Sequence, residues 1–160
     1  MDAKFRGVSS TGGNGVTLPD LRSLAAIEAR IDDVAVGKAD EPNAAADELM
    51  SLGEDALSHW VLARGEMPSQ ARKEGFRLLA LQRQGARGDP SFNACRETCR
   101  ELAYHYNLIV LEPEHPDRVR RVRLAAMLAK HLCLFIAGKL QVAGLGEFCC
   151  SSKPLRAGGG

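Results

Sequence analysis

The feature that most restricts how this chain can fold is an apolar stretch from Leu124 to Ala137, 14 residues interrupted only by Lys130 and His131. A membrane-spanning helix needs about 20 apolar residues, so we expect this stretch to lie in a protein core. It belongs to a helix predicted from Arg118 to about Val142. Because a helix that is apolar nearly all round is a buried one, the sequence predicts a bundle packed around this C-terminal helix.

Four further helices are predicted from apolar residues that recur at helical spacing and from the capping and breaking residues around them. In chain order these helices extend from Thr17 to Gly37, from Asn43 to Gly65, from Ser69 to about Gln84, and from Asp89 to about Tyr106. The tetrad at 108–111 fits either a short buried strand or the last turn of the fourth helix. The predicted fold class is therefore all-α, a bundle of about five helices with flexible termini.

The 160 residues of the chain fit one domain. We assign residues 17–145 to the helical bundle domain, and residues 1–16 and 146–160 to flexible tails of mainly small and polar residues. No apolar run follows the basic residues of the first segment, so no secretory signal is expected. Five cysteines without such a signal favour free thiols in a reducing compartment. The predicted location is the cytoplasm, with no membrane contact.

Charge is distributed unevenly along the chain. Residues 19–66 hold 11 acidic and four basic side chains, a net charge of −7, whereas residues 67–130 hold seven acidic and 12 basic ones, a net charge of +5. Oppositely charged helices that pack beside each other explain this pattern most simply. A basic surface that meets a polyanion is the alternative.

Cys95 and Cys99 lie four residues apart on one predicted helix face. That face consists of Phe92, Cys95, Cys99, Leu102, Ala103 and Tyr106. Residues on such a face normally pack, so both cysteines are predicted to be core side chains. The alternative is a thiol or metal sensor in which His131 and Cys133 of the last helix join Cys95 and Cys99. Their spacing differs from that of zinc motifs, which use short gaps across a turn.

The predicted third helix suggests a second alternative function. Arg72, Phe76, Arg83 and Arg87 share one face of that helix, at spacings of 4, 7 and 4 residues. An aromatic ring among arginines suits phosphate contact combined with stacking on a base. A buried Phe76 with arginine side chains lying along its apolar edge is the structural explanation of the same pattern. Nucleic-acid binding through this helix therefore stays open.

Arg118, Arg120, Arg121 and Arg123 form a basic cluster at the start of the last helix. Positive charge is unfavourable at a helix N-terminus unless an anion is near. The four side chains span too wide an arc for one internal acidic strip to pair with all of them. At least one is therefore expected to face solvent. We interpret the cluster as a candidate binding surface for a protein partner or another anion.

No sequence pattern indicates catalysis. The sequence contains no nucleophile elbow and no phosphate-binding loop with its lysine. We therefore expect a small, non-enzymatic cytosolic protein, regulatory or adaptor in kind, that acts through its helical surface and needs no cofactor. The expected partner is another protein, nucleic acid is the alternative, and assembly into a homo-oligomer is left open.

Overall fold

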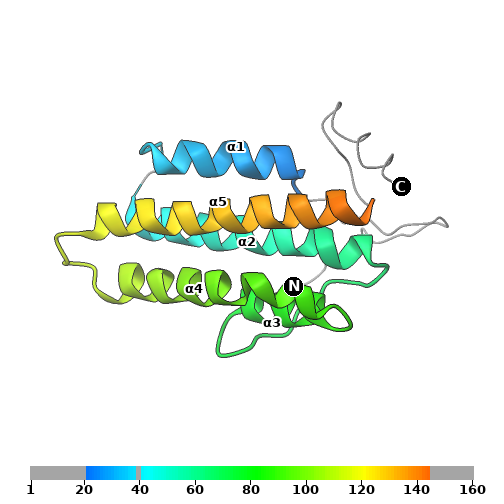
Figure 1. Ribbon diagram of the computed structural model, residues 1–160. Coiled ribbons are helices and arrows are strands. Elements are labelled where there is room, and N and C mark those ends of the chain that lie inside the picture. The colour runs from blue at the N-terminus through cyan, green and yellow to red at the C-terminus, as the bar shows by residue number, and fades with distance from the viewer. Residues whose placement is uncertain (1–20, 39–40, 145–160) are drawn as a thin grey trace, which may run out of the picture.

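The computed structural model describes residues 21–38 and 41–144 and shows an all-α fold, as the sequence predicts (Figure 1). In chain order its elements are α1 (Leu24–Ala35), α2 (Pro42–Ala63), α3 (Arg77–Ala86), a 3₁₀ helix η2 (Pro90–Cys95), α4 (Arg96–Leu111) and α5 (Arg118–Ala143). The described ranges contain no strand beyond one isolated bridge. The predicted tails lie outside these ranges.

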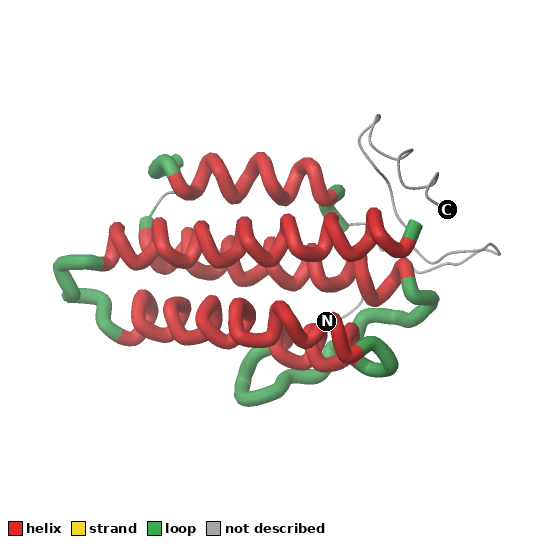
Figure 2. The backbone as a smooth tube through the Cα atoms, viewed as in Figure 1, coloured by secondary structure: helices red, strands yellow, loops and turns green. Residues whose placement is uncertain are grey.

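Helix α5 is the central element, also as predicted. It packs against α2, and α1 and α4 lie on its two sides (Figures 1 and 2). The short α3 packs against α2 and α4. The colours of Figure 1 show that α2 and α5 run in the same direction and that α1 and α4 run opposite to them. Because α1 and α4 lie on the two sides of α5, the face of α5 that points away from α2 lies between them.

The buried side of α5 is a long stripe of apolar residues that meets all three neighbouring helices. Its members are Val122, Ala125, Ala126, Ala129, Leu132, Cys133, Ile136 and Leu140. The opposite side is not buried. Met127 is 64% exposed and Leu134 is 49% exposed, although both belong to the stretch predicted to be a core segment. The helix is therefore central without being covered all round.

The structure corrects the predicted start of α1 and of α2. Helix α1 begins at Leu24, because Ser23 is extended and its hydroxyl accepts a hydrogen bond from the N–H of Ala26; the predicted cap Thr17 lies outside the described residues. Helix α2 begins at Pro42, and its cap is Glu41, whose carboxylate accepts hydrogen bonds from the next two free N–H groups. Asn43, predicted to be this cap, lies inside the helix.

The prediction for α3 is wrong at its start. Residues 69–76 form a loop rather than a helix, because Glu74 and Gly75 have left-handed backbone angles (φ 56° and 89°) that no α-helix accommodates. Lys73 and Phe76 exchange two backbone hydrogen bonds across this turn. The helix ends at Ala86, close to the predicted end at about Gln84: Gly85 lies within it, and the chain turns at Gly88 (φ 74°).

The prediction for the fourth helix is mostly confirmed. Its first turns form η2, α4 continues to Leu111, and the tetrad at 108–111 is the last helical turn rather than a strand. Five members of the predicted stripe are buried, namely Phe92, Cys95, Cys99, Leu102 and Ala103, while Tyr106 is partly buried.

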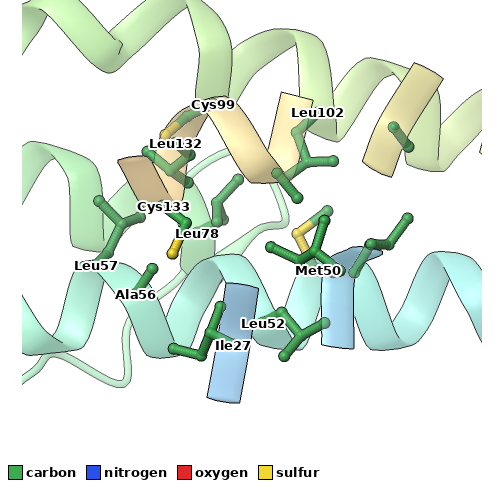
Figure 3. Packing of buried hydrophobic residues seen from close by; sticks show 14 of the residues in the cluster. Ile27, Met50, Leu52, Ala56, Leu57, Leu78, Cys99, Leu102, Leu132 and Cys133 are labelled. Carbon is green, nitrogen blue, oxygen red and sulfur yellow. The ribbon is translucent and has the colours of Figure 1, made fainter. Parts of the chain in front are cut away.

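Two glycines allow helices to approach closely in the core. An added Cβ at Gly53 of α2 would lie 2.9 Å from Leu78, 3.4 Å from Leu102 and 3.6 Å from Leu132, which come from α3, α4 and α5. Figure 3 shows these three leucines together with Cys99 and Cys133. Gly85 lies against the stacked rings of Trp60 and Phe92, whose centroids are 5.2 Å apart. Both glycines are thus needed for packing, not for backbone freedom.

By length and composition alone, α5 would also be able to cross a membrane. The central helix of a globular bundle meets the same criterion, and both lysines of α5 are engaged in ion pairs, Lys130 with Asp32 and Lys139 with Asp89. The cytoplasmic location therefore remains a prediction from the sequence.

The glycine contacts lead to a paired prediction. Gly85→Ala places a methyl group 2.7 Å from the Phe92 ring and 2.9 Å from Trp60, so we expect a loss of about 1–3 kcal/mol in the free energy of unfolding. Gly138→Ala is the control, because its Cβ would meet nothing within 4 Å on the exposed side of α5. Alanine should stabilise that site by about 0.5–1 kcal/mol. Urea unfolding measures both changes, and equal effects at the two sites would contradict the packing.

Candidate functional site

The open face of α5 forms the floor of a groove of about 680 Å³. Ile31, Asp32 and Ala35 of α1 form one wall, and Ala94, Cys95 and Thr98 of η2 and α4 form the other. The floor consists mainly of apolar side chains of α5, among them Met127, Leu134 and Phe135. Exposed apolar side chains gathered in a concave surface, rather than scattered singly, are typical of an interaction site.

A second hollow, of about 390 Å³, lies where the link between α1 and α2 meets the start of α5. Its apolar lining residues include Val34, Val36 and Pro42 on one side and Val119 on α5. Arg123 also lines it. Val119, Arg123, Met127 and Leu134 fall on one face of α5 at helical spacing. The two hollows are therefore parts of one strip along this face.

The basic cluster at the start of α5 divides into two pairs. Arg118 donates hydrogen bonds to the carbonyl oxygen of Ile109 (3.3 Å from Nη2) and to the side-chain oxygen of Asn43. Arg121, whose side chain is 17% exposed, donates to the Glu112 carboxylate at 2.6 Å and to the carbonyl oxygen of Leu108 at 3.3 Å. Both therefore hold the end of α4 against α5, and Arg121 lowers the pKa of Glu112.

Arg120 and Arg123 behave differently. Both are exposed, and no hydrogen-bond or ion-pair partner for either is present among residues 21–38 and 41–144. This agrees with the expectation that at least one arginine of the cluster faces solvent. Arg120 also lies in the first turn of α5, where the helix dipole adds positive potential. Glu41 lines the same hollow as Arg123, but its carboxylate caps α2 by accepting hydrogen bonds from the N–H groups of Asn43 and Ala44. The strip thus has two arginines without an ion-pair partner at one end.

Elsewhere in the groove the charges are paired. Lys130 of α5 lies 2.6 Å from Asp32 and 3.6 Å from Glu28 of α1, so it is not a free cation. Asp32 raises the pKa of Lys130 and keeps this ion pair charged. The middle of the groove is therefore mainly apolar. Any preference for a charged ligand would come from Arg120 and Arg123 at the end of the strip.

The three thiols of the described chain are core side chains. Of the four residues proposed as a metal site, Cys95, Cys99 and Cys133 are buried, whereas His131 is exposed. In the described part of the chain, no group of three or more His, Cys, Asp or Glu residues is arranged to hold a metal ion. A hydrogen bond with Cys95, together with burial, raises the pKa of Cys99, and burial raises the pKa of Cys133 to about 11. Cys99 and Cys133 are therefore poor nucleophiles, whereas the hydrogen bond with Cys99 lowers the pKa of Cys95.

The residues proposed to contact nucleic acid do not share a helix face. Arg72 lies in the loop before α3, and Phe76 precedes the helix and packs edge-on against Tyr106, with ring centroids 5.8 Å apart. Phe76 is thus partly buried against the core. Arg83 on α3 and Arg87 directly after it are exposed, and other basic residues line the same hollow.

Comparison with known proteins finds no matching family model, no similar curated protein and no similar solved structure. The geometry of this chain is therefore the basis of the functional argument.

The divided arginine cluster yields a prediction about stability. Arg118→Ala and Arg121→Ala should each lower the melting temperature by several degrees, because each removes hydrogen bonds worth about 1–2 kcal/mol from the junction of α4 and α5. Arg120→Glu should leave the melting temperature unchanged or raise it slightly, since it replaces an exposed cation at the positive end of a helix. Thermal unfolding followed by circular dichroism distinguishes them. A large drop for Arg120→Glu would mean that its side chain has an internal partner.

Proposed function

We propose that this protein is a non-enzymatic adaptor or regulator that binds an amphipathic helix of a partner protein along the open face of α5. The observation that carries the proposal is the exposed apolar strip from Val119 to Leu134, which lies in a groove with walls from α1 and from η2 and α4. Helix-in-groove binding is a common way to recognise a partner segment, with anchors at positions i, i+3 or i+4, and i+7.

The length of the strip supports a helical partner. From Val119 to Leu134 the helix rises about 22 Å, at about 1.5 Å per residue, so a partner helix of about 15 residues would cover it. Met127, 64% exposed at the middle of the strip, suits such a contact, because the flexible thioether side chain adapts to different apolar anchors. The hollow beside Val119 would take an anchor side chain near one end.

Charge supports a particular orientation of that helix. The unpaired Arg120 and Arg123 lie at the end of the strip where α5 begins, whereas Lys130 is neutralised by the acids of α1. A partner helix with acidic residues at the corresponding end would be attracted to the arginines, and one with basic residues there would be repelled. Such charge pairing fixes register and orientation more than it adds affinity.

A peptide selection tests this proposal. Random helical peptides of about 16 residues, displayed on phage, are selected on the native chain and counter-selected on a Met127→Asp, Leu134→Asp variant. We expect enriched peptides to have apolar residues at helical spacing and acidic residues at one end. Their affinity, measured by fluorescence anisotropy, should fall about tenfold or more in Arg120→Glu, Arg123→Glu protein, as for charges at the edge of a desolvated contact.

The matched control is Tyr104→Asp, which removes another exposed apolar side chain, on α4 and outside the residues that line the groove. Enriched peptides should bind this variant as they bind the native chain. Peptides that bind the Met127→Asp, Leu134→Asp variant equally well would place binding elsewhere. Light scattering measures whether the native chain forms dimers. If it does, and if the Met127→Asp, Leu134→Asp variant is a monomer, the groove binds a second copy of this chain instead.

A further inference from the structure

We propose that a basic hollow between α3 and α4 binds a compact ligand with two or more adjacent phosphate groups. The hollow has a volume of about 480 Å³. Five cationic side chains line it, namely Lys73 in the loop before α3, Arg83 of α3 and Arg87 directly after it, and Arg96 and Arg100 of α4. It is separate from the groove on α5, because no residue lines both.

The positive charge of this hollow is only partly compensated. Glu74 lies 3.1 Å from Lys73 and 3.4 Å from Arg100, and Glu66 lies 3.1 Å from Arg87. Two carboxylates therefore form ion pairs with three of the five cations, and neither carboxylate lines the hollow. For Arg83 and Arg96 the described segments provide no ion-pair or hydrogen-bond partner. An anion that enters the hollow would therefore contact two unpaired guanidinium groups, those of Arg83 and Arg96.

Those two arginines come from different elements. Arg83 is on the exposed side of α3, and Arg96 is the first residue of α4, so their relative position is fixed by the packing of the two helices through η2. Each guanidinium presents a planar set of N–H donors that matches two oxygens of one phosphate group. Two such groups that line one hollow suit a ligand with more than one phosphate.

The floor of the hollow adds neutral polar groups. Gln82 is almost fully buried, and its side-chain nitrogen is 3.4 Å from both the carbonyl oxygen of Phe92 and the side-chain oxygen of Asn93. Asn93 is exposed and also lines the hollow. Its amide N–H₂ can donate a hydrogen bond to a phosphate oxygen. The lining thus combines charged and neutral donors.

Size and lining favour a small ligand over nucleic acid. A volume of about 480 Å³ is within the range of small-molecule sites. Among the described residues, none that lines the hollow is aromatic, and Phe76 packs against Tyr106 instead. The base stacking on which single-strand binding depends therefore has no ring here. The shared ligand chemistry is therefore a diphosphate or triphosphate group, free or attached to a nucleoside.

Calorimetric titration of the full chain tests the proposal with four probes, which are inorganic phosphate, tripolyphosphate, ATP and a 20-base-pair DNA duplex. We expect tripolyphosphate to bind about 100-fold more tightly than inorganic phosphate, because only the longer anion reaches several guanidinium groups at once. Equal affinity for ATP and tripolyphosphate would indicate that the phosphates alone are recognised. Tighter binding of ATP would indicate that the nucleoside contributes.

Two double variants decide whether the binding is local. Arg83→Ser, Arg96→Ser removes the two unpaired cations of the hollow, and we expect the affinity for tripolyphosphate to fall about tenfold or more. Arg120→Ser, Arg123→Ser is the matched control, because it removes the same charge from two exposed, unpaired arginines of α5; there the affinity should change less than about twofold. Equal melting temperatures establish that both variants are folded.

Three results would overturn the proposal. Equal losses in the two double variants would show that tripolyphosphate responds to overall charge only. Absence of tripolyphosphate binding up to about 1 mM ligand, a free energy of only about −4 kcal/mol, would show that the hollow is not a phosphate site. Tighter binding of the duplex than of tripolyphosphate, lost in the Arg83→Ser, Arg96→Ser variant and steeply weakened by salt, would identify nucleic acid as the ligand instead.

Discussion

The packing of α5 against α2 is the contact on which the rest of the structure depends. At Gly53 the backbone of α2 has no side chain, and leucines from α3, α4 and α5 converge on that point. Interiors are packed as densely as organic crystals, so a gap or an added methyl group at such a point is felt by every neighbour. With α2 behind α5 and α1 and α4 beside it, the side left uncovered is the one that carries Met127 and Leu134.

Much of the fold could be predicted from the sequence, because apolar periodicity and helix breakers act locally. The all-α class, the central place of α5 and the buried stripe from Phe92 to Ala103 are all confirmed. The start of α3 was missed because the pattern from Ser69 onward is helical in spacing, while the turn at Glu74 and Gly75 is stabilised by a hydrogen-bonded bridge to Phe76. Gly85 resembles a helix stop in the sequence, but it lies within α3, where it packs against Trp60 and Phe92. That role cannot be read locally, because it depends on the position of the Trp60 ring in another helix.

The candidate sites were less accessible to sequence reasoning, because each depends on which helices lie side by side. The sequence indicated the arginines at 118–123, but only the packing of α4 on α5 determines that Arg118 and Arg121 are used internally while Arg120 and Arg123 stay free. Arg83 and Arg87 were noted, whereas Lys73, Arg96 and Arg100 join them only through the turn that folds α4 back along α3. The apolar residues of the α5 groove looked like core residues, and no local signal distinguishes a buried methionine from an exposed one.

The central claim is that α5 has one face in the core and one face open, and cysteine accessibility tests it most directly. In protein with Cys149 and Cys150 replaced by serine, the remaining native thiols that the structure describes are buried. Single cysteines are then introduced at Met127, Leu134, Ala126 and Ala129, and their rates of reaction with a thiol reagent are compared. The account predicts rates at 127 and 134 close to those of an unfolded peptide, and rates at 126 and 129 slower by at least about 100-fold. Equal protection at all four positions would contradict it, because α5 would then have no open face.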